Sequence, residues 1–177
     1  MTHMKRNNLS FRAIWQASKI HRMSVSLLCM GGLFAAQSSP VLAQAAYGSY
    51  IGGGVGIGVN GEFAGNVAFR YKFLRAPISI RTQALIGSTF AIVPTVSYDF
   101  PLGWQANAYI GLGASIPFSG DNKTPVGNRA TFAIQPGIDY AIPNSPIVVF
   151  GNTIIAIDGY KNGGTAASFQ FGAGFQY

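Results

Sequence analysis

Residues 62–73 read E-F-A-G-N-V-A-F-R-Y-K-F, and side chains of two kinds alternate along this stretch. One set of alternate positions is mostly large and apolar: Phe63, Gly65, Val67, Phe69, Tyr71 and Phe73. The other set is small, polar or charged: Glu62, Ala64, Asn66, Ala68, Arg70 and Lys72. A helix would scatter both sets around its circumference, whereas a β-strand places them on opposite faces. The stretch therefore predicts a strand with one apolar face.

Alternation with a period of two continues from Tyr47 to the end of the 177-residue chain. It predicts eight strands, at about 47–59, 62–73, 78–88, 90–100, 104–116, 129–142, 147–157 and 165–177. Such lengths suit strands that cross a membrane, which need about 9–11 residues each. We therefore expect an all-β fold, an eight-stranded antiparallel up-and-down transmembrane β-barrel.

Two kinds of connection alternate between these strands. One kind is tight and mostly contains proline: residues 74–77, 101–103 and 143–146. The other kind is richer in Gly, Asn and Asp: residues 60–61, 87–89, 119–128 and 159–164. Short turns on one rim and longer polar loops on the other are typical of outer-membrane barrels.

The N-terminal region has the pattern of a secretory signal, with a basic segment, an apolar segment and small residues in turn. Five of the twelve basic residues lie within positions 1–22, where no acidic residue occurs. The apolar stretch follows at 25–36. We expect cleavage after Ala43, with Ala45 as the alternative. Residues 1–43 would then be a signal peptide and residues 44–177 the barrel domain. The only cysteine, Cys29, and both histidines would leave with the signal.

The composition is unusual for a soluble globular protein, because only 10% of the residues are charged where about 25% is usual. The chain has no run of 18 or more apolar residues, so it predicts no transmembrane helix. Without residues 1–43, the seven basic and five acidic side chains that remain give a net charge of about +2. They form no basic patch, so we expect no nucleic-acid partner.

Aromatic residues gather near the rim that carries the proline turns and both ends of the mature chain. The set comprises Tyr47, Tyr71, Phe73, Tyr98, Phe100, Trp104, Tyr140, Phe175 and Tyr177. A thinner set marks the other rim: Phe63, Phe90, Phe118 and Phe132. Aromatic rings with a polar edge prefer the headgroup level of a bilayer. We interpret the first set as a membrane-interface girdle, against the alternative of aromatic residues in a soluble core.

Four charged residues fall on the predicted inner face near the same rim: Arg70, Arg81, Asp99 and Asp139. The turn at 74–77 would set Arg70 roughly opposite Arg81, where two like charges destabilise a strand pair. The two aspartates could neutralise them. The cluster is either an ion-selective constriction or, as we favour, a salt-bridge plug in a lumen only just wide enough for side chains.

Two prolines lie inside predicted strands. Residues 92–101 and 134–143 share the pattern I-x-P-x-[VI]-x-Y-x-[FI]-P, which places Pro94 and Pro136 on the lipid-facing side. A proline removes a ladder hydrogen bond, and a closed barrel has no free edge to accommodate the loss. We therefore expect a β-bulge at each proline.

The chain ends on alternating apolar residues: Phe169, Phe171, Ala173, Phe175 and Tyr177. In this terminal pattern, residues 44–177 resemble small eight-stranded outer-membrane β-barrels of the opacity-protein and OmpX-like kind. The sequences of residues 47–54 and 93–101 also resemble those of a cyanobacterial branch of such barrels. The resemblance implies an outer-membrane location in a Gram-negative envelope, and recognition of Phe169, Phe171, Phe175 and Tyr177 by the barrel-assembly machinery. The family most often ends on Phe, so Tyr177 departs slightly from its pattern.

The sequence indicates the function of the protein less specifically than its fold. The mature chain lacks histidine, which excludes a Ser-His dyad, and the glycine-rich residues 52–58 lack the helix of a dinucleotide site. We expect no enzyme activity, cofactor or metal site. The preferred expectation is a monomeric barrel in outer-membrane lipid with a structural or envelope role and at most minor porin-like permeability. The alternatives are a surface-interaction or adhesion barrel acting through loop 117–128, and a secreted, soluble, lipocalin-like ligand-binding barrel.

Overall fold

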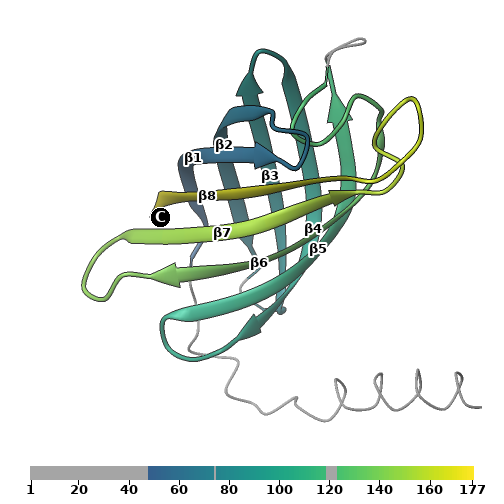
Figure 1. The fold of residues 1–177 in the computed structure, drawn as a ribbon. Coiled ribbons are helices and arrows are strands. Elements are labelled where there is room, and N and C mark those ends of the chain that lie inside the picture. Colours follow the sequence, from purple (N-terminus) through teal and green to yellow (C-terminus); the bar gives the residue numbers. More distant parts are fainter. Residues whose placement is uncertain (1–47, 74, 119–122) are drawn as a thin grey trace, which may run out of the picture. The chain divides into compact units, whose positions relative to one another are not determined.

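The computed structural model describes residues 48–73, 75–118 and 123–177. Eight strands follow one another along it: β1 (Tyr50–Gly58), β2 (Phe63–Lys72), β3 (Ile78–Gly87), β4 (Phe90–Pro101), β5 (Ala106–Pro117), β6 (Thr131–Ala141), β7 (Ile147–Ala156) and β8 (Ala166–Gln176). Each strand pairs antiparallel with the next, and β8 pairs with β1 to close a barrel (Figure 1). The predicted all-β, eight-stranded, up-and-down fold is confirmed. The expected signal peptide, its cleavage site at Ala43 or Ala45, and Tyr47 lie outside the described residues.

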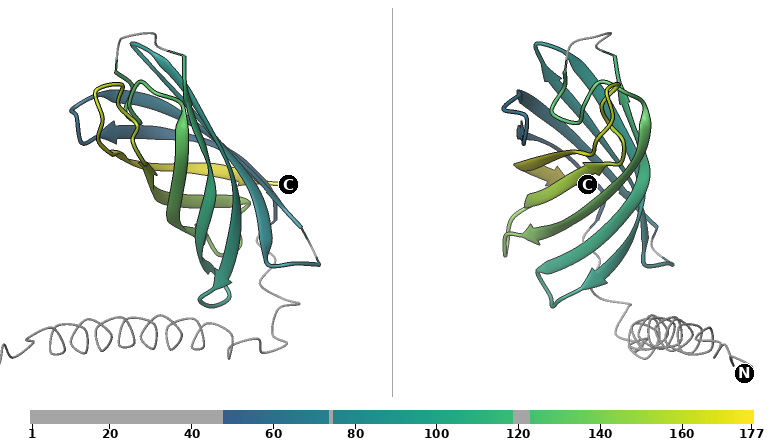
Figure 2. Two further views of the ribbon diagram at one scale, coloured as in Figure 1. Left: turned by 90° about the vertical axis from the view of Figure 1, so that its right-hand side faces the viewer. Right: turned by 45° about the vertical axis from the view of Figure 1, so that its right-hand side comes forward.

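The antiparallel order gives the barrel two different ends. The connections after β2, β4 and β6 lie at the same end as the C-terminus, which we call the turn end (Figure 2). The connections after β1, β3, β5 and β7 lie at the opposite end, which we call the loop end. Side chains that are far apart in the sequence can therefore meet at one level of the barrel.

Strand pairing is staggered around the barrel. A path perpendicular to the strands runs from Tyr50 through Arg70, Arg81, Thr95, Gly113, Ala133, Ala156 and Ala166. Ala166 precedes Ser168, the first residue of β8 that pairs with β1, at Gly58. The path thus returns about ten residues away from its start, a stagger that requires tilted strands. Figure 2 shows this slant of the strands across the barrel.

Alternate residues of each strand face opposite sides of the barrel wall. On β2, Phe63, Val67 and Phe69 are exposed, whereas Asn66 and Arg70 are buried in the interior. The alternation predicted for residues 62–73 is confirmed. Because the side-chain period of a strand is two, this pattern also excludes a register shifted by one residue, which would turn Arg70 outward.

The two internal prolines each interrupt one ladder without forming a bulge. Pro94 pairs in register with Thr82 of β3, and Pro136 pairs in register with Ile110 of β5. Within the described β4–β5 and β6–β7 ladders these prolines have no partner, but the register continues unchanged beyond them. The predicted β-bulges are therefore wrong. In an antiparallel strand each residue directs its N–H to one neighbour only, so the opposite ladder can hold the register.

Paired glycines form the seam where β1 meets β8. Gly54 lies opposite Gly172, and Gly52 lies opposite Gly174. A Cβ atom on Gly54 would lie 2.1 Å from the carbonyl oxygen of Phe171, far inside contact distance. The two backbones approach so closely at this seam that only glycine fits.

Candidate functional site

The candidate site is the barrel interior, and its turn end holds a cluster of buried charges. We define the charge cluster as four side chains that are at most 2% exposed: Arg70, Arg81, Asp99 and Asp139. They come from β2, β3, β4 and β6 and face inward because each lies on the buried phase of its strand. The structure places Arg70 directly opposite Arg81 in the β2–β3 ladder. The two aspartates reach both guanidinium groups across the lumen.

Each arginine of the charge cluster bridges both aspartates. Arg70 Nη2 lies 2.8 Å from Asp99 Oδ2, and Arg70 Nη1 lies 3.2 Å from Asp139 Oδ2. Arg81 Nη2 lies 3.2 Å from Asp99 Oδ1 and 2.8 Å from Asp139 Oδ2. Opposite charges at this distance in a low-dielectric interior attract far more strongly than in water. This pairing offsets the repulsion between the two adjacent arginines.

Two serines that were not among the predicted site residues, Ser79 and Ser97, complete the pairing. The Ser79 hydroxyl donates to Asp99 and accepts a 3.2 Å hydrogen bond from Arg70 Nε. Arg81 Nε donates to Ser97 Oγ over 2.9 Å, and Ser97 Oγ donates to Asp99 Oδ1 over 3.2 Å. The serines could have been found from the sequence, because each lies two positions before a cluster member on the same strand face.

Lys72 brings a further positive charge to the turn end of this cluster. Its Nζ lies 3.3 Å from Asp99 Oδ2, and its side chain is 13% exposed. The charge cluster with Lys72 therefore contains three cations and two carboxylates. Lys72 extends the ion-pair network from the buried interior toward the rim.

Aromatic rings pack against the charge cluster. The Arg81 guanidinium lies 3.3 Å from the centroid of the Tyr109 ring, a cation–π contact. Tyr50 OH donates to Asp139 Oδ1 over 3.1 Å, and its ring stacks on Phe150 with centroids 5.8 Å apart. Gly137, opposite Tyr109 on β6, leaves the room that this ring occupies. The charged groups are thus paired with one another and packed against aromatic rings.

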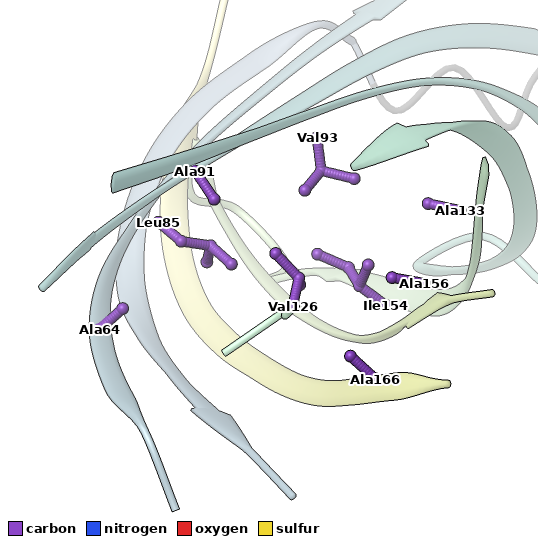
Figure 3. Close-up of a cluster of buried hydrophobic side chains, with 9 residues drawn as sticks. All are labelled: Ala64, Leu85, Ala91, Val93, Val126, Ala133, Ile154, Ala156 and Ala166. Atoms are coloured by element: carbon purple, nitrogen blue, oxygen red, sulfur yellow. The ribbon is translucent and has the colours of Figure 1, made fainter. Parts of the chain in front are cut away.

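The loop end of the interior is filled by an apolar cluster that the sequence did not reveal. We call it the apolar cap; its members are Ala64, Leu85, Ala91, Val93, Val126, Ala133, Ile154, Ala156 and Ala166. All but Val126 lie on strands. Figure 3 shows Val126 among the strand residues, near Leu85 and Ile154. The inward-facing residues therefore include one from a loop, Val126, in addition to those that alternate along the strands.

Val126 belongs to a buried turn, Thr124–Gly127, in the connection between β5 and β6. Thr124 and Gly127 exchange backbone hydrogen bonds of 2.9 and 3.0 Å, and Thr124 Oγ1 accepts a 3.2 Å bond from Val126 N. Asn60 Nδ2 donates to Thr124 O over 3.0 Å, which ties this turn to the connection after β1. Gly127 has a φ of 95°, a conformation that favours glycine. The turn is therefore fixed with Val126 pointing into the barrel.

The outer surface carries the predicted aromatic girdle residues. In the described part of this set, the following are exposed: Tyr71, Phe73, Tyr98, Trp104, Tyr140, Phe175 and Tyr177. Phe100 is half-buried, and its ring centroid lies 4.8 Å from that of Tyr98. Tyr71 and Phe73 form a similar pair, 5.4 Å apart. The structure places these residues on the outward face at and near the turn end.

The residues of the predicted assembly signal also point outward. Phe169, Phe171 and Phe175 are exposed on β8, and Tyr177 is exposed directly after it. Tyr177 N donates to Ser49 O over 3.1 Å, which continues the β1–β8 pairing to the last residue. The C-terminal residue is thus held against the start of the first strand.

Metal-binding groups and membrane-spanning helices would point to other kinds of site. In residues 48–73, 75–118 and 123–177, no three His, Cys, Asp or Glu side chains are grouped as a metal site would need. The same residues contain no helix with the length and hydropathy of a membrane span.

Comparisons with known proteins concern the fold. No protein-family model matches the chain, and no curated protein matches its sequence. The structure is similar to a de novo designed transmembrane β-barrel, with a TM-score of 0.54 and 8% identity over 73% of this chain and 96% of that one. The crystal structure of Neisserial surface protein A gives a TM-score of 0.47 and 12% identity, over 73% of this chain and 97% of that one. The similarity to the designed barrel shows that the chain shares the fold of transmembrane β-barrels.

Proposed function

We propose that this protein is an integral β-barrel of the outer membrane with a structural or envelope role. The observation that carries the proposal is the separation of charge from the outer surface. Every charged residue of the strands lies on an inward-facing position: Arg70, Lys72, Arg81, Asp99 and Asp139. The outward positions of all eight strands are uncharged and are apolar, aromatic or small, with Thr82 and Thr153 among the small residues.

Lipid is the environment that suits such a surface. Soluble monomers rarely expose a continuous apolar patch beyond about 300–600 Å², whereas apolar side chains surround this barrel on each strand. A closed ladder also satisfies the backbone hydrogen bonds that a bilayer cannot. Aromatic residues near the turn end, such as Tyr71 and Tyr98, would lie at the headgroup level.

The filled interior supports a structural role over transport. The charge cluster obstructs the turn end, and the apolar cap obstructs the loop end. We infer at most minor passive permeability to small solutes. The protein would then act without a cofactor, as a monomer that contacts outer-membrane lipid.

The two alternatives have less support. A surface-interaction role through loop 117–128 needs exposed loop residues. In the described part of this loop Phe118 and Lys123 are exposed, whereas Thr124–Gly127 are buried. A soluble lipocalin-like barrel needs a ligand cavity and a polar outer face. Here the charge cluster and the apolar cap occupy the two ends of the interior, and the outer face is apolar.

Fractionation of the expressing cells tests the proposal. We expect the protein in the outer-membrane fraction, released by detergent and not by alkaline carbonate, and migrating differently in gels before and after heating. Refolded protein in a planar bilayer should give no resolved conductance steps. Recovery from the soluble periplasm would refute the membrane assignment, and reproducible steps would replace the structural role with transport.

A further inference from the structure

A belt of polar side chains separates the charge cluster from the apolar cap. From the loop end to the turn end, the strands repeat an order of apolar, polar and charged inward residues: Ala64, Asn66 and Arg70 on β2; Leu85, Gln83 and Arg81 on β3; Val93, Thr95 and Asp99 on β4; Ala133, Gln135 and Asp139 on β6. On β7 the order is Ile154, Asn152 and Phe150. The middle level of the interior is therefore amide-rich on several sides.

Many polar atoms at this level lack a protein partner. Within the described residues, no hydrogen-bond partner exists for Asn66 Nδ2 and Oδ1, Gln83 Oε1, Tyr109 OH, Gln135 Nε2, Asn152 Nδ2 and Oδ1, and Gln170 Oε1. The residues that carry these atoms are at least nine-tenths buried. An unpaired buried polar group costs about 1–3 kcal/mol in a folded protein, so a whole belt of them needs an explanation.

The polar residues of the belt face a common space. Thr95 Oγ1 donates to Gln135 Oε1 over 2.7 Å, a bond that spans from β4 to β6 past the intervening β5. Asn152 lies directly opposite Gln170 in the β7–β8 ladder. A Cβ atom on Gly137 would lie within 2.7 Å of both the Tyr109 ring and the Asn152 Cβ, so these two side chains are neighbours.

We propose that this polar belt encloses a hydration chamber that binds ordered water. Donors (the amide nitrogens and Tyr109 OH) and acceptors (the amide oxygens) are both unpaired, and the belt carries no formal charge. That combination suits a small neutral molecule able to donate and accept. Water meets this need, because a buried water typically makes about three hydrogen bonds to otherwise unpaired groups. An ion would leave half of these atoms unsatisfied.

The chamber is closed at both ends, so its water exchanges slowly. On one side Val126 and the apolar cap separate it from the loop end. On the other, Arg81 and its partners separate it from the turn end. Exchange requires the temporary displacement of one of these closures. The inference rests on the interior alone and holds whether or not the barrel lies in a membrane.

Nuclear magnetic resonance of the detergent-extracted protein tests the chamber, with water itself as the probe. We expect cross-relaxation between water and the side-chain amides of Asn66, Asn152 and Gln135, with the sign that marks water held for longer than nanoseconds. The exposed side-chain amide of Gln105 is the internal control and should show only the weak signal of surface water. Absence of long-lived water at Asn66 and Asn152 would overturn the proposal.

Two variants test whether the same water contacts different strands and whether the apolar cap limits its exchange. Asn152→Leu should displace water and reduce the signal at Asn66, which is on a different strand. Val126→Gly removes the apolar side chain from the cap and should shorten the residence time of the water. Unchanged signals at Asn66 in Asn152→Leu, or an unchanged residence time in Val126→Gly, would contradict a shared and capped chamber. If either variant does not fold, the wild-type measurement alone decides.

Discussion

Arg81 makes contacts with most of the groups that fill the turn end of the barrel. Its guanidinium pairs with Asp99 and Asp139, and it stacks over Tyr109. Replacement by Met keeps much of the volume but leaves two buried carboxylates with fewer cations. Removing one partner from a buried ion pair costs about 3–5 kcal/mol, so Arg81→Met should lose roughly that much stability in denaturant unfolding in detergent micelles.

Arg129 provides the matched control for Arg81. It pairs with Asp158, and both side chains are about half exposed. An exposed ion pair contributes only about 0–1 kcal/mol, so Arg129→Met should barely move the unfolding midpoint. Equal losses in the two variants would show that burial of the charge cluster does not determine its importance.

A substitution at Leu112 tests whether the outer surface of the barrel faces lipid or water. Leu112 lies on β5 among outward residues and is 51% exposed. A basic residue facing the middle of a bilayer costs about 2–4 kcal/mol, whereas an exposed substitution in a soluble protein usually changes stability by about 0.5 kcal/mol or less. Leu112→Arg should therefore lower stability in lipid vesicles by the larger amount.

Leu102, in the turn after β4, is the control for this substitution because it is exposed and outside the strands. Leu102→Arg should have little effect on unfolding in the same vesicles. If Leu112→Arg is equally harmless, the outer wall does not face hydrocarbon.

The seam between β1 and β8 depends on backbone proximity. At Gly54 an added Cβ would meet the Phe171 carbonyl oxygen at 2.1 Å, whereas at Gly53, which points outward, the nearest atom would be at 3.7 Å. Gly54→Ala should therefore separate the two strands and reduce the heat-modifiable, folded fraction, at a cost of about 1–3 kcal/mol or more. Gly53→Ala should fold normally. Equal yields would mean that the seam can widen without cost.

The last strand exposes the aromatic residues that we expect to direct assembly of the barrel. Tyr177 is 68% exposed, and its backbone pairs with Ser49 at the start of the barrel. A carboxylate in place of this ring would face the interface where aromatic residues are preferred. Tyr177→Asp should reduce insertion in cells strongly, measured as folded protein in the outer membrane, whereas Tyr177→Phe should insert normally. Normal insertion of Tyr177→Asp would remove the support for an assembly signal.

Much of the barrel could be predicted because a strand has a period of two. Once Arg70 is assigned inward, the alternation along β2 gives Asn66 and Ala64 the same face, and the tight turn after it brings Arg81 opposite Arg70. The strand boundaries, the closure and the inward charges follow from such local rules. The pairing of each arginine with both aspartates does not, since it depends on distances across the lumen.

Two features could not be read from the sequence, for different reasons. Val126 lies in a loop, where no periodicity assigns a face, so the sequence indicates a polar connection at 119–128 but not the inward direction of Val126. Pro94 suggested a bulge because proline lacks an N–H. The missing hydrogen bond shifts the register only if the neighbouring strand on the opposite side cannot hold it. The sequence does not say which neighbour the N–H of residue 94 would face, because that depends on the pairing of β4 with both β3 and β5.

The apolar cap and the charge cluster act as two closures in series around the hydration chamber. Opening one leaves the other intact, so neither Val126→Gly nor Arg81→Ser alone should let ions cross a planar bilayer. The two changes together should produce conductance steps that neither single variant shows, because solute can then pass from the loop end through the polar belt to the turn end. Heat-modifiable migration must first show that each variant forms a barrel. Conductance in Val126→Gly alone would mean that the paired arginines and aspartates do not obstruct the turn end. A silent but folded double variant would place the barrier in the polar belt itself.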